Sequence, residues 1–187
     1  LNFDGVNDYV TLGSVITTGS SYTKEAMIKP NAVSGNYNIL SSTGDVFWIS
    51  NNTISAGHTN NFSHVTASAS TLLNTWNHVA VTYDAPTTTM KLYVNGVMVS
   101  QNTNVPASAG NTIQIGAYAN VALFNGGIDE VRIWNKALTG EEIIRRKNCE
   151  LQGTETGLLA YYKFNQGAGN YNNANITSLL DATGNAN

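Results

Sequence analysis

Charged residues, cysteine and proline are all scarce in this chain, and no long apolar run occurs. Only 11% of its 187 residues are charged, and its net charge is −3 at pH 7. Nucleic acids and anionic membrane surfaces both require a basic face, and no extended stretch rich in Lys or Arg supplies one. No run of about 18 apolar residues is present either. We therefore expect neither nucleic-acid binding nor membrane insertion.

The lone cysteine and the three histidines exclude further classes of site. Cys149 cannot form an internal disulfide, and a domain of this length buries roughly 70% of its unfolded surface without one. No histidine lies near Cys149 in the sequence to activate a catalytic thiol. His58, His64 and His78 are spaced too widely for a helical zinc pair. Because the chain shows neither an initiator methionine nor a signal peptide, we expect it to be a domain cut from a larger protein.

Most of the chain is predicted to form β-strands. Apolar residues alternate with polar ones, or gather in short runs, in five segments bounded by turn residues: 22–30, 36–42, 45–51, 76–84 and 112–116. Asn95-Gly96 separates two further apolar runs and is the preferred pair for a type I′ hairpin turn. The polar segment 53–70 predicts short strands at best. Many strands separated by turn signals indicate an all-β sandwich of two sheets.

One short helix is predicted late in the chain. Thr139 is a candidate N-cap, and Glu142 three residues later completes a capping box. Glu141 lies at the positive end of the helix dipole, and Arg145 lies near the negative end. We expect this helix to end near Asn148.

Before this helix, the stretch 127–138 reads GIDEVRIWNKAL and carries two adjacent carboxylates in an otherwise apolar strand. Alternation through Val131 and Ile133 predicts one buried face, and it slips near Ile128, where we expect a bulge or the start of the strand. The carboxylates of Asp129 and Glu130 are therefore predicted to point to opposite faces.

Four motifs in one order resemble a known family: FDGVNDYV at residue 3, WNHVAVTYD at 76, LYVNGV at 92 and GIDEVRIWNKALTGEEI at 127. They are similar to the laminin-G-like jelly-roll domains of bacterial surface proteins, which are related to pentraxins and to concanavalin-A-like lectins and glucanases. The likeness covers residue 1 to about 144 and implies a two-sheet antiparallel jelly roll over 1–150, in a secreted or cell-surface protein. Met27 stands where the family usually has tryptophan, and its flexible thioether is expected to fill that space.

The tail, 151–187, admits two interpretations. In the family, a segment like YYKF…DATGN precedes the FDG motif, whereas here it follows the helix. Either residues 158–165 form a return strand that completes the sandwich, or they begin a following repeat. We favour the return strand, because Leu159, Tyr161 and Phe164 would otherwise be exposed.

A structural calcium ion is expected from the resemblance, which points to Asp4 and Asp129 as ligands. The turn from Asp4 to Asp8 adds carboxylate, amide and carbonyl oxygens, including those of Asn7 and Asp8, and these suit a hard cation. In the alternative interpretation, Asp4 and Asp8 cap turns while Glu130 pairs with Arg132 or Lys136.

Aromatic side chains are the candidates for contact with a sugar. We expect Trp76 and Trp134 to lie in the core. Trp48 points away from Phe47 and Ile49, so it lies either between the sheets or on an open sheet face, and we favour the position between the sheets. On an open face, its expected neighbours are Tyr37, Asn51 and Tyr118.

No catalytic constellation is convincing. The paired carboxylates of retaining glucanases on this fold, ExDxxE, do not occur. Of the three motifs of lyases on this fold, only a Tyr-Lys strand at Tyr162-Lys163 has a counterpart, and Gln114-Ile115 is followed by Gly116 where the lyases have histidine.

We therefore predict a non-catalytic carbohydrate-binding or adhesion module within a larger secreted or cell-surface bacterial protein. A polysaccharide or other glycan is the expected partner, with a surface glycoprotein and the neighbouring domains of the same chain as further partners. A structural spacer is the alternative, and a polysaccharide lyase or glycoside hydrolase is less favoured.

Overall fold

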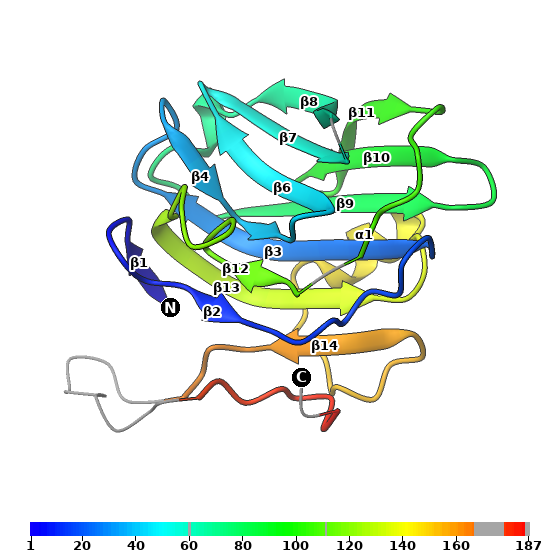
Figure 1. Ribbon diagram of the computed structural model, residues 1–187. Coiled ribbons are helices and arrows are strands. Elements are labelled where there is room, and N and C mark those ends of the chain that lie inside the picture. Colours follow the sequence, from blue (N-terminus) through cyan, green and yellow to red (C-terminus); the bar gives the residue numbers. More distant parts are fainter. Residues whose placement is uncertain (60, 111, 167–177, 186–187) are drawn as a thin grey trace.

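The protein is a β-sandwich of two layers with one helix outside them (Figure 1). The computed structural model describes all residues except 60, 111, 167–177 and 186–187. The expected all-β antiparallel jelly-roll class with one short late helix is confirmed. Among the described residues, no helix is long and apolar enough to cross a membrane.

One layer is a seven-stranded sheet in the order β1-β13-β3-β9-β10-β11, with β14 also paired to β13. Its strands are β1 (Asn2–Asp4), β3 (Tyr22–Pro30), β9 (Asn77–Asp84), β10 (Thr89–Val94), β11 (Val97–Asn102), β13 (Asn125–Trp134) and β14 (Leu158–Tyr162). All the pairings are antiparallel, and Asn95-Gly96 forms the tight turn between β10 and β11 as expected.

The other layer consists of two smaller sheets. The four-stranded sheet has the order β4-β6-β7-β8, and the three-stranded sheet has the order β2-β12-β5. Their strands are β2 (Val10–Thr11), β4 (Asn36–Asn38), β5 (Leu40–Ser41), β6 (Asp45–Ser50), β7 (Thr53–His58), β8 (Asn61–Ser68) and β12 (Gln114–Ile115), and a 3₁₀ turn, η1 (Ser70–Leu72), follows β8. The amide of Ile39 donates to Phe47 O at 2.9 Å, so the two small sheets meet there.

The main core lies between the two layers. Alternate residues of β3 and β9, including Ala26, Ile28, Val79 and Val81, face Phe47 and other apolar side chains of the small sheets. All five are no more than 1% exposed. Because one side chain in two points inward, strand alternation alone produces this core.

A second, smaller core lies on the outer face of the seven-stranded sheet, beneath the helix α1 (Gly140–Arg146) and the segment after it. Trp134 is fully buried there, as expected, against Ile143 and Leu151. The capping box of Thr139 and Glu142 is present as predicted. The helix ends at Arg146, close to the expected Asn148.

The tail strand β14 lies in the domain's own sheet, on the edge of β13. Val131 is opposite Tyr162 and Trp134 is opposite Leu158, while β1 pairs with the earlier part of β13, where Asn2 is opposite Gly127. The register of β13 against β3 shifts between Asp129 and Arg132, which is the bulge expected in this stretch.

Three edges of the sheets are closed or interrupted. Beside β14, Tyr161 N donates to Asp181 Oδ1 at 3.0 Å and Asn185 Nδ2 donates to Leu159 O at 2.9 Å. Beside β8, Thr66 N donates to Ser100 Oγ of β11 at 3.2 Å. Strand β11 itself is interrupted by a register shift after Met98. We refer to these three features as the closed edges.

Two sequence predictions about the strands and the core are wrong. Trp76 is 48% exposed, because it shares the outer face of the seven-stranded sheet with His78 and lies against Gly127, beyond the cover of the helix. The segment 53–70 contains two long strands, β7 and β8. Its alternation is weak because only small or scattered apolar residues, such as Ile54 and Val65, reach the core.

Candidate functional site

Trp48 lies on the open outer face of the four-stranded sheet. Its neighbours in β6, Phe47 and Ile49, are fully buried in the main core, so strand alternation turns Trp48 outward. The indole is half-buried, and Nε1 donates to Phe62 O of β8 at 3.2 Å. The structure therefore places Trp48 on the open face, and not in the favoured position between the sheets.

Two more aromatic rings gather at this position. Phe62 and Tyr118 are both half-buried, and their rings make an edge contact with centroids 5.6 Å apart and an interplanar angle of 63°. We call Trp48, Phe62 and Tyr118 the aromatic platform. Sequence reasoning missed Phe62, although it is the one aromatic residue in the polar segment 53–70. That isolation was the only available signal.

A short turn holds Tyr118 in place. Tyr118 and Val121 exchange two backbone hydrogen bonds of 2.9 Å, and Asn38 N donates to Ala122 O at 2.9 Å. Because Asn38 is opposite Trp48 in the register, this contact ties the turn 118–122 to the strand next to the indole. The platform therefore unites side chains from β6, β8 and a distant turn.

The other predicted neighbours of Trp48 lie elsewhere. Tyr37 is opposite Ile49 in the register and packs against the main core, so it is on the wrong face. Asn51 is exposed in the turn between β6 and β7, where its φ of 48° is left-handed, and its side chain donates to Ser50 Oγ at 3.4 Å. The structure therefore brings Tyr118 to the site, places Asn51 at the end of the hairpin and excludes Tyr37 from the face.

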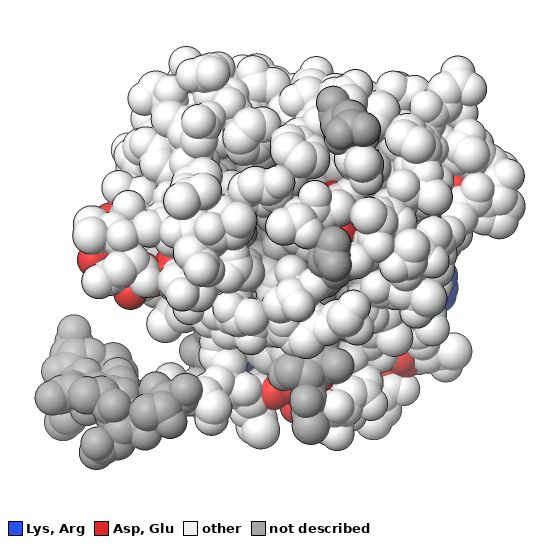
Figure 2. Space-filling model, in the orientation of Figure 1, with Lys and Arg blue, Asp and Glu red and all other residues white. Residues whose placement is uncertain are grey.

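The surroundings of the platform are polar but uncharged. Ser55 of β7 is opposite Trp48, and Thr66 of β8 is opposite Ser55. Figure 2 shows few charged atoms on the side of the molecule that carries β4 and β6. Hydroxyl and amide groups are the usual partners of sugar hydroxyls, while aromatic rings suit the apolar C–H surface of a sugar.

The four predicted calcium ligands do not converge. Asp4 Oδ1 accepts from Val6 N at 2.7 Å, and Asp8 Oδ2 accepts from Asp4 N at 2.9 Å, so both carboxylates cap their own turn. Asn7 is exposed in the same turn.

Asp129 lies away from that turn. Asp4 is opposite Asn125 in the register, four residues before Asp129, which corresponds to about 13 Å along β13. Asp129 lies instead near the amino terminus of Leu1, where burial raises its pKa. Within the described ranges, no three acidic, histidine or cysteine side chains form a group suited to a metal ion. The expected four-residue set therefore does not fit a shared calcium site, and calcium binding stays a prediction.

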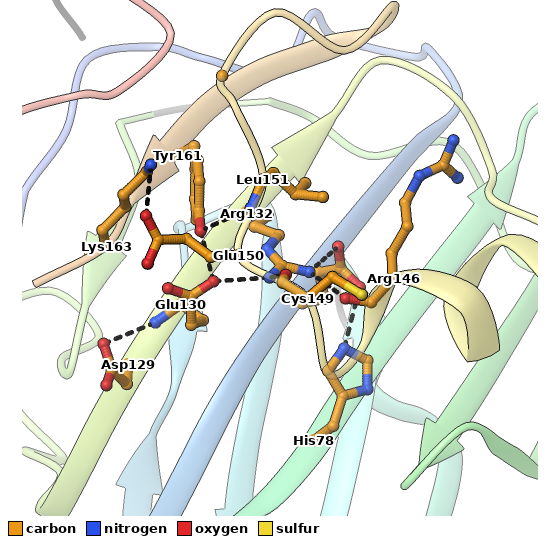
Figure 3. Close-up of polar contacts among 12 residues, drawn as sticks. His78, Asp129, Glu130, Arg132, Arg146, Cys149, Glu150, Leu151, Tyr161 and Lys163 are labelled. Atoms are coloured by element: carbon orange, nitrogen blue, oxygen red, sulfur yellow. Dashed lines mark hydrogen bonds and ion pairs between the residues drawn. The ribbon is translucent and has the colours of Figure 1, made fainter.

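A cluster of charged residues is buried beneath the helix and its following segment (Figure 3). Arg132 lies at its centre. The guanidinium forms an ion pair of 2.6 Å with Glu130 and donates to the carbonyls of Arg146 and Cys149. The Tyr161 hydroxyl donates to the same Glu130 carboxylate. Glu130 thus has the basic partner that the alternative interpretation assigns to it.

Glu25 is the fully buried acid of this cluster. It accepts from His78 Nε2 and from Trp134 Nε1, each at 3.0 Å. Burial alone would raise the pKa of Glu25, but the hydrogen bond from His78 and the charges of His78 and Arg132 outweigh it and lower that pKa. Because its members are paired with one another and covered by chain, this cluster fastens β14 and the helix segment to the sheet.

A second buried pair joins the two layers. Lys24 of β3 is paired with Asp45 of β6, and Ser108 Oγ donates to the other oxygen of Asp45 at 2.8 Å. Next to this pair, His58 contacts Tyr22 Oη at 2.7 Å and Pro106 O at 2.6 Å. Burial lowers the pKa of His58 to about 4, so the imidazole is neutral at pH 7.

The two layers of antiparallel strands define a jelly-roll β-sandwich. The chain belongs to the concanavalin A-like lectin/glucanases superfamily, whose family model matches residues 4–144. The resemblance found in the sequence motifs is thereby confirmed. No curated protein sequence matches the chain.

Solved structures share the fold. A candidate carbohydrate-binding protein from Bacteroides ovatus is 25% identical with a TM-score of 0.78; the match covers 98% of this chain but only 55% of that one. A pentraxin from Limulus polyphemus is 19% identical with a TM-score of 0.59, and the match covers 80% of this chain and 81% of that one. Domain 4 of an extracellular arabinanase from Geobacillus stearothermophilus, in complex with arabinotriose, is 20% identical with a TM-score of 0.55, and the match covers 75% and 72%.

Proposed function

We propose that the domain is a non-catalytic carbohydrate-binding module and that the aromatic platform holds the sugar. The observation that carries this proposal is the position of three half-buried rings, Trp48, Phe62 and Tyr118, on an open sheet face where Thr66 exposes a hydroxyl group. Rings placed in this way stack on the C–H surface of a sugar while neighbouring polar groups bond its hydroxyls. The carbohydrate-binding description of the Bacteroides protein supports the same function.

The indole Nε1–H of Trp48 already has a protein acceptor in Phe62 O, so the ring offers its face rather than its donor. Tyr118 is the more suitable residue to change, because it lies on a turn and its loss leaves the strands intact. Tyr118→Ala is expected to weaken glycan binding about threefold to tenfold, which corresponds to the loss of one aromatic stacking contact of about 0.5–1.5 kcal/mol.

The measurement is affinity electrophoresis or isothermal titration against a panel of soluble polysaccharides. Tyr9→Ala is the control, because Tyr9 is a tyrosine with 42% of its surface exposed that lies outside the platform. Equal weakening by both variants would contradict the assignment of the site. If the wild-type protein shows no saturable binding to any glycan, the proposal is wrong and a structural spacer becomes the better account.

We also propose that the domain releases no sugar. The acids Glu25 and Asp45 are each 1% exposed and already paired, so they are closed to substrate. Release of reducing ends or of unsaturated uronates from a bound polysaccharide would contradict this part of the proposal.

A glycan ligand is consistent with a secreted or cell-surface location and with an adhesive role toward a polysaccharide or a surface glycoprotein. The chain spans 55% of the length of the Bacteroides protein, so we propose neighbouring domains as its covalent partners. Detection of the parent protein by antibody on intact cells would test the location, and a purely internal signal would contradict it.

A further inference from the structure

The layer that carries the aromatic platform contains no Lys or Arg. None occurs between Lys29 and Lys91, and none occurs between Lys91 and Arg132. These two intervals include β4 to β8, β12 and the turn 118–122. All the basic residues therefore lie on the seven-stranded sheet, on the helix or in the segments that follow them.

Acidic residues are almost as scarce there. Asp45 is the only one between residues 30 and 83, and none lies between residues 92 and 128. Asp45 is 1% exposed and its charge is offset by Lys24 inside the sandwich. Burial lowers the pKa of His64 on β8 below its ordinary value of 6.5, so this imidazole is neutral at pH 7.

An open sheet face without charge selects among sugars. A uronate, sialate or sulfate group that docks on the face loses hydration and finds no cation in return, and such uncompensated burial is costly. An amino sugar would likewise find no carboxylate. A sugar hydroxyl, by contrast, needs no cation, and the exposed hydroxyl of Thr66 beside the platform can donate to it or accept from it.

This inference rests on the proposed function of the site. We propose that the ligand is an uncharged polysaccharide segment that binds across the aromatic platform, and that the site excludes acidic glycans. The uncharged face, rather than the overall charge of the chain, is responsible for this selectivity. The test compares each neutral polysaccharide that binds with its own carboxymethylated form, so that the backbone stays the same while charge is added.

Carboxymethylation is expected to weaken binding by at least about tenfold, because each carboxylate held at the face lacks a partner. Binding of the neutral form is expected to change by less than about twofold between 50 and 500 mM NaCl, because no ion pair is present to be screened. Equal or tighter binding of the carboxymethylated form, or a steep loss with salt, would overturn the inference while leaving carbohydrate binding itself intact.

A variant pair makes the test sharper. Thr66 is exposed on β8, two strands across from Trp48, so Thr66→Lys adds a cation beside the platform and Thr66→Gln adds length without charge. Thr66→Lys is expected to bind the carboxymethylated polysaccharide at least about threefold more tightly than the wild-type protein does, and this binding should weaken with added salt. Thr66→Gln is expected to bind it no more tightly than the wild-type protein. Recovery by both variants would contradict an electrostatic origin. Absence of binding to every polysaccharide would instead overturn the proposed function.

Discussion

Truncating Tyr162 to alanine should reveal whether the tail strand is an integral part of the domain. Tyr162 is 1% exposed and packs in the main core from β14, opposite Val131. Replacing a buried aromatic ring by alanine typically costs about 3–5 kcal/mol, because transfer energy is lost and a cavity remains. For a domain of this size, that loss lowers the melting midpoint by about 6–20 °C. Domains are stable by only about 5–15 kcal/mol, so the variant should be visibly compromised.

The assay is urea unfolding followed by tryptophan fluorescence, since Trp134 lies opposite β14. Leu180→Ala is the control, because Leu180 is 69% exposed in the same tail and its loss should change stability by less than about 0.5 kcal/mol. A loss below about 1 kcal/mol for Tyr162→Ala would refute the reasoning. Deletion of everything after Gly157 without any change in melting would refute it still more directly and would favour the start of a following repeat.

Three further predictions concern pH and metal. The pKa of His58 is about 4 in the folded protein and 6.5 in a model peptide, so the unfolded state binds more protons between these two values. The free energy of unfolding should therefore fall as the pH drops from 6.5 toward 4. In His58→Gln, the midpoint of urea unfolding should fall less over this pH range. Burial alone would raise the pKa of Glu142, but hydrogen bonds from Lys136 and from the Thr139 amide lower it to about 2. The contribution of Glu142 to folding stability is therefore complete above pH 4.5 and disappears toward pH 2. Glu142→Gln should remove this part of the fall in melting midpoint with decreasing pH. Calcium binding requires the melting midpoint to fall when EDTA is added, and Asp8→Ala but not Asp129→Ala should abolish the effect, because the structure separates these residues; an unchanged midpoint in the wild type would contradict calcium binding itself.

The fold could be read from local patterns because several of them are unambiguous. Asn95-Gly96 specifies its hairpin, and the reciprocal bonds of Thr139 and Glu142 begin the helix where the capping box predicts. Residues 22–30 alternate regularly, and β3 has these bounds. Each of these signals depends only on residues close in sequence.

The site was only partly predictable because it depends on contacts between distant segments. Trp48 could be assigned to one face of its strand, but the residues of β6 alone do not determine whether another layer covers that face. Phe62 and Tyr118 meet across 56 residues of sequence, and no local pattern reports such a contact. The same reason explains the wrong prediction for Trp76. The helix and the segment after it cover the outer face of the seven-stranded sheet at Ala80, but they do not reach Trp76.

The closed edges have a consequence for how the protein behaves at high concentration. With 11% charged residues and a net charge of −3, the molecules repel one another weakly. Edge strands with unpaired backbone groups could then pair with those of another molecule, edge to edge, and build fibrils. Here Asp181 and Asn185 occupy the backbone groups beside β14, Ser100 occupies an amide of β8, and the irregular β11 offers no straight strand to extend. At these three edges we therefore expect hydrogen bonds already made, rather than electrostatic repulsion, to limit pairing with another molecule, and this limit should persist in concentrated salt.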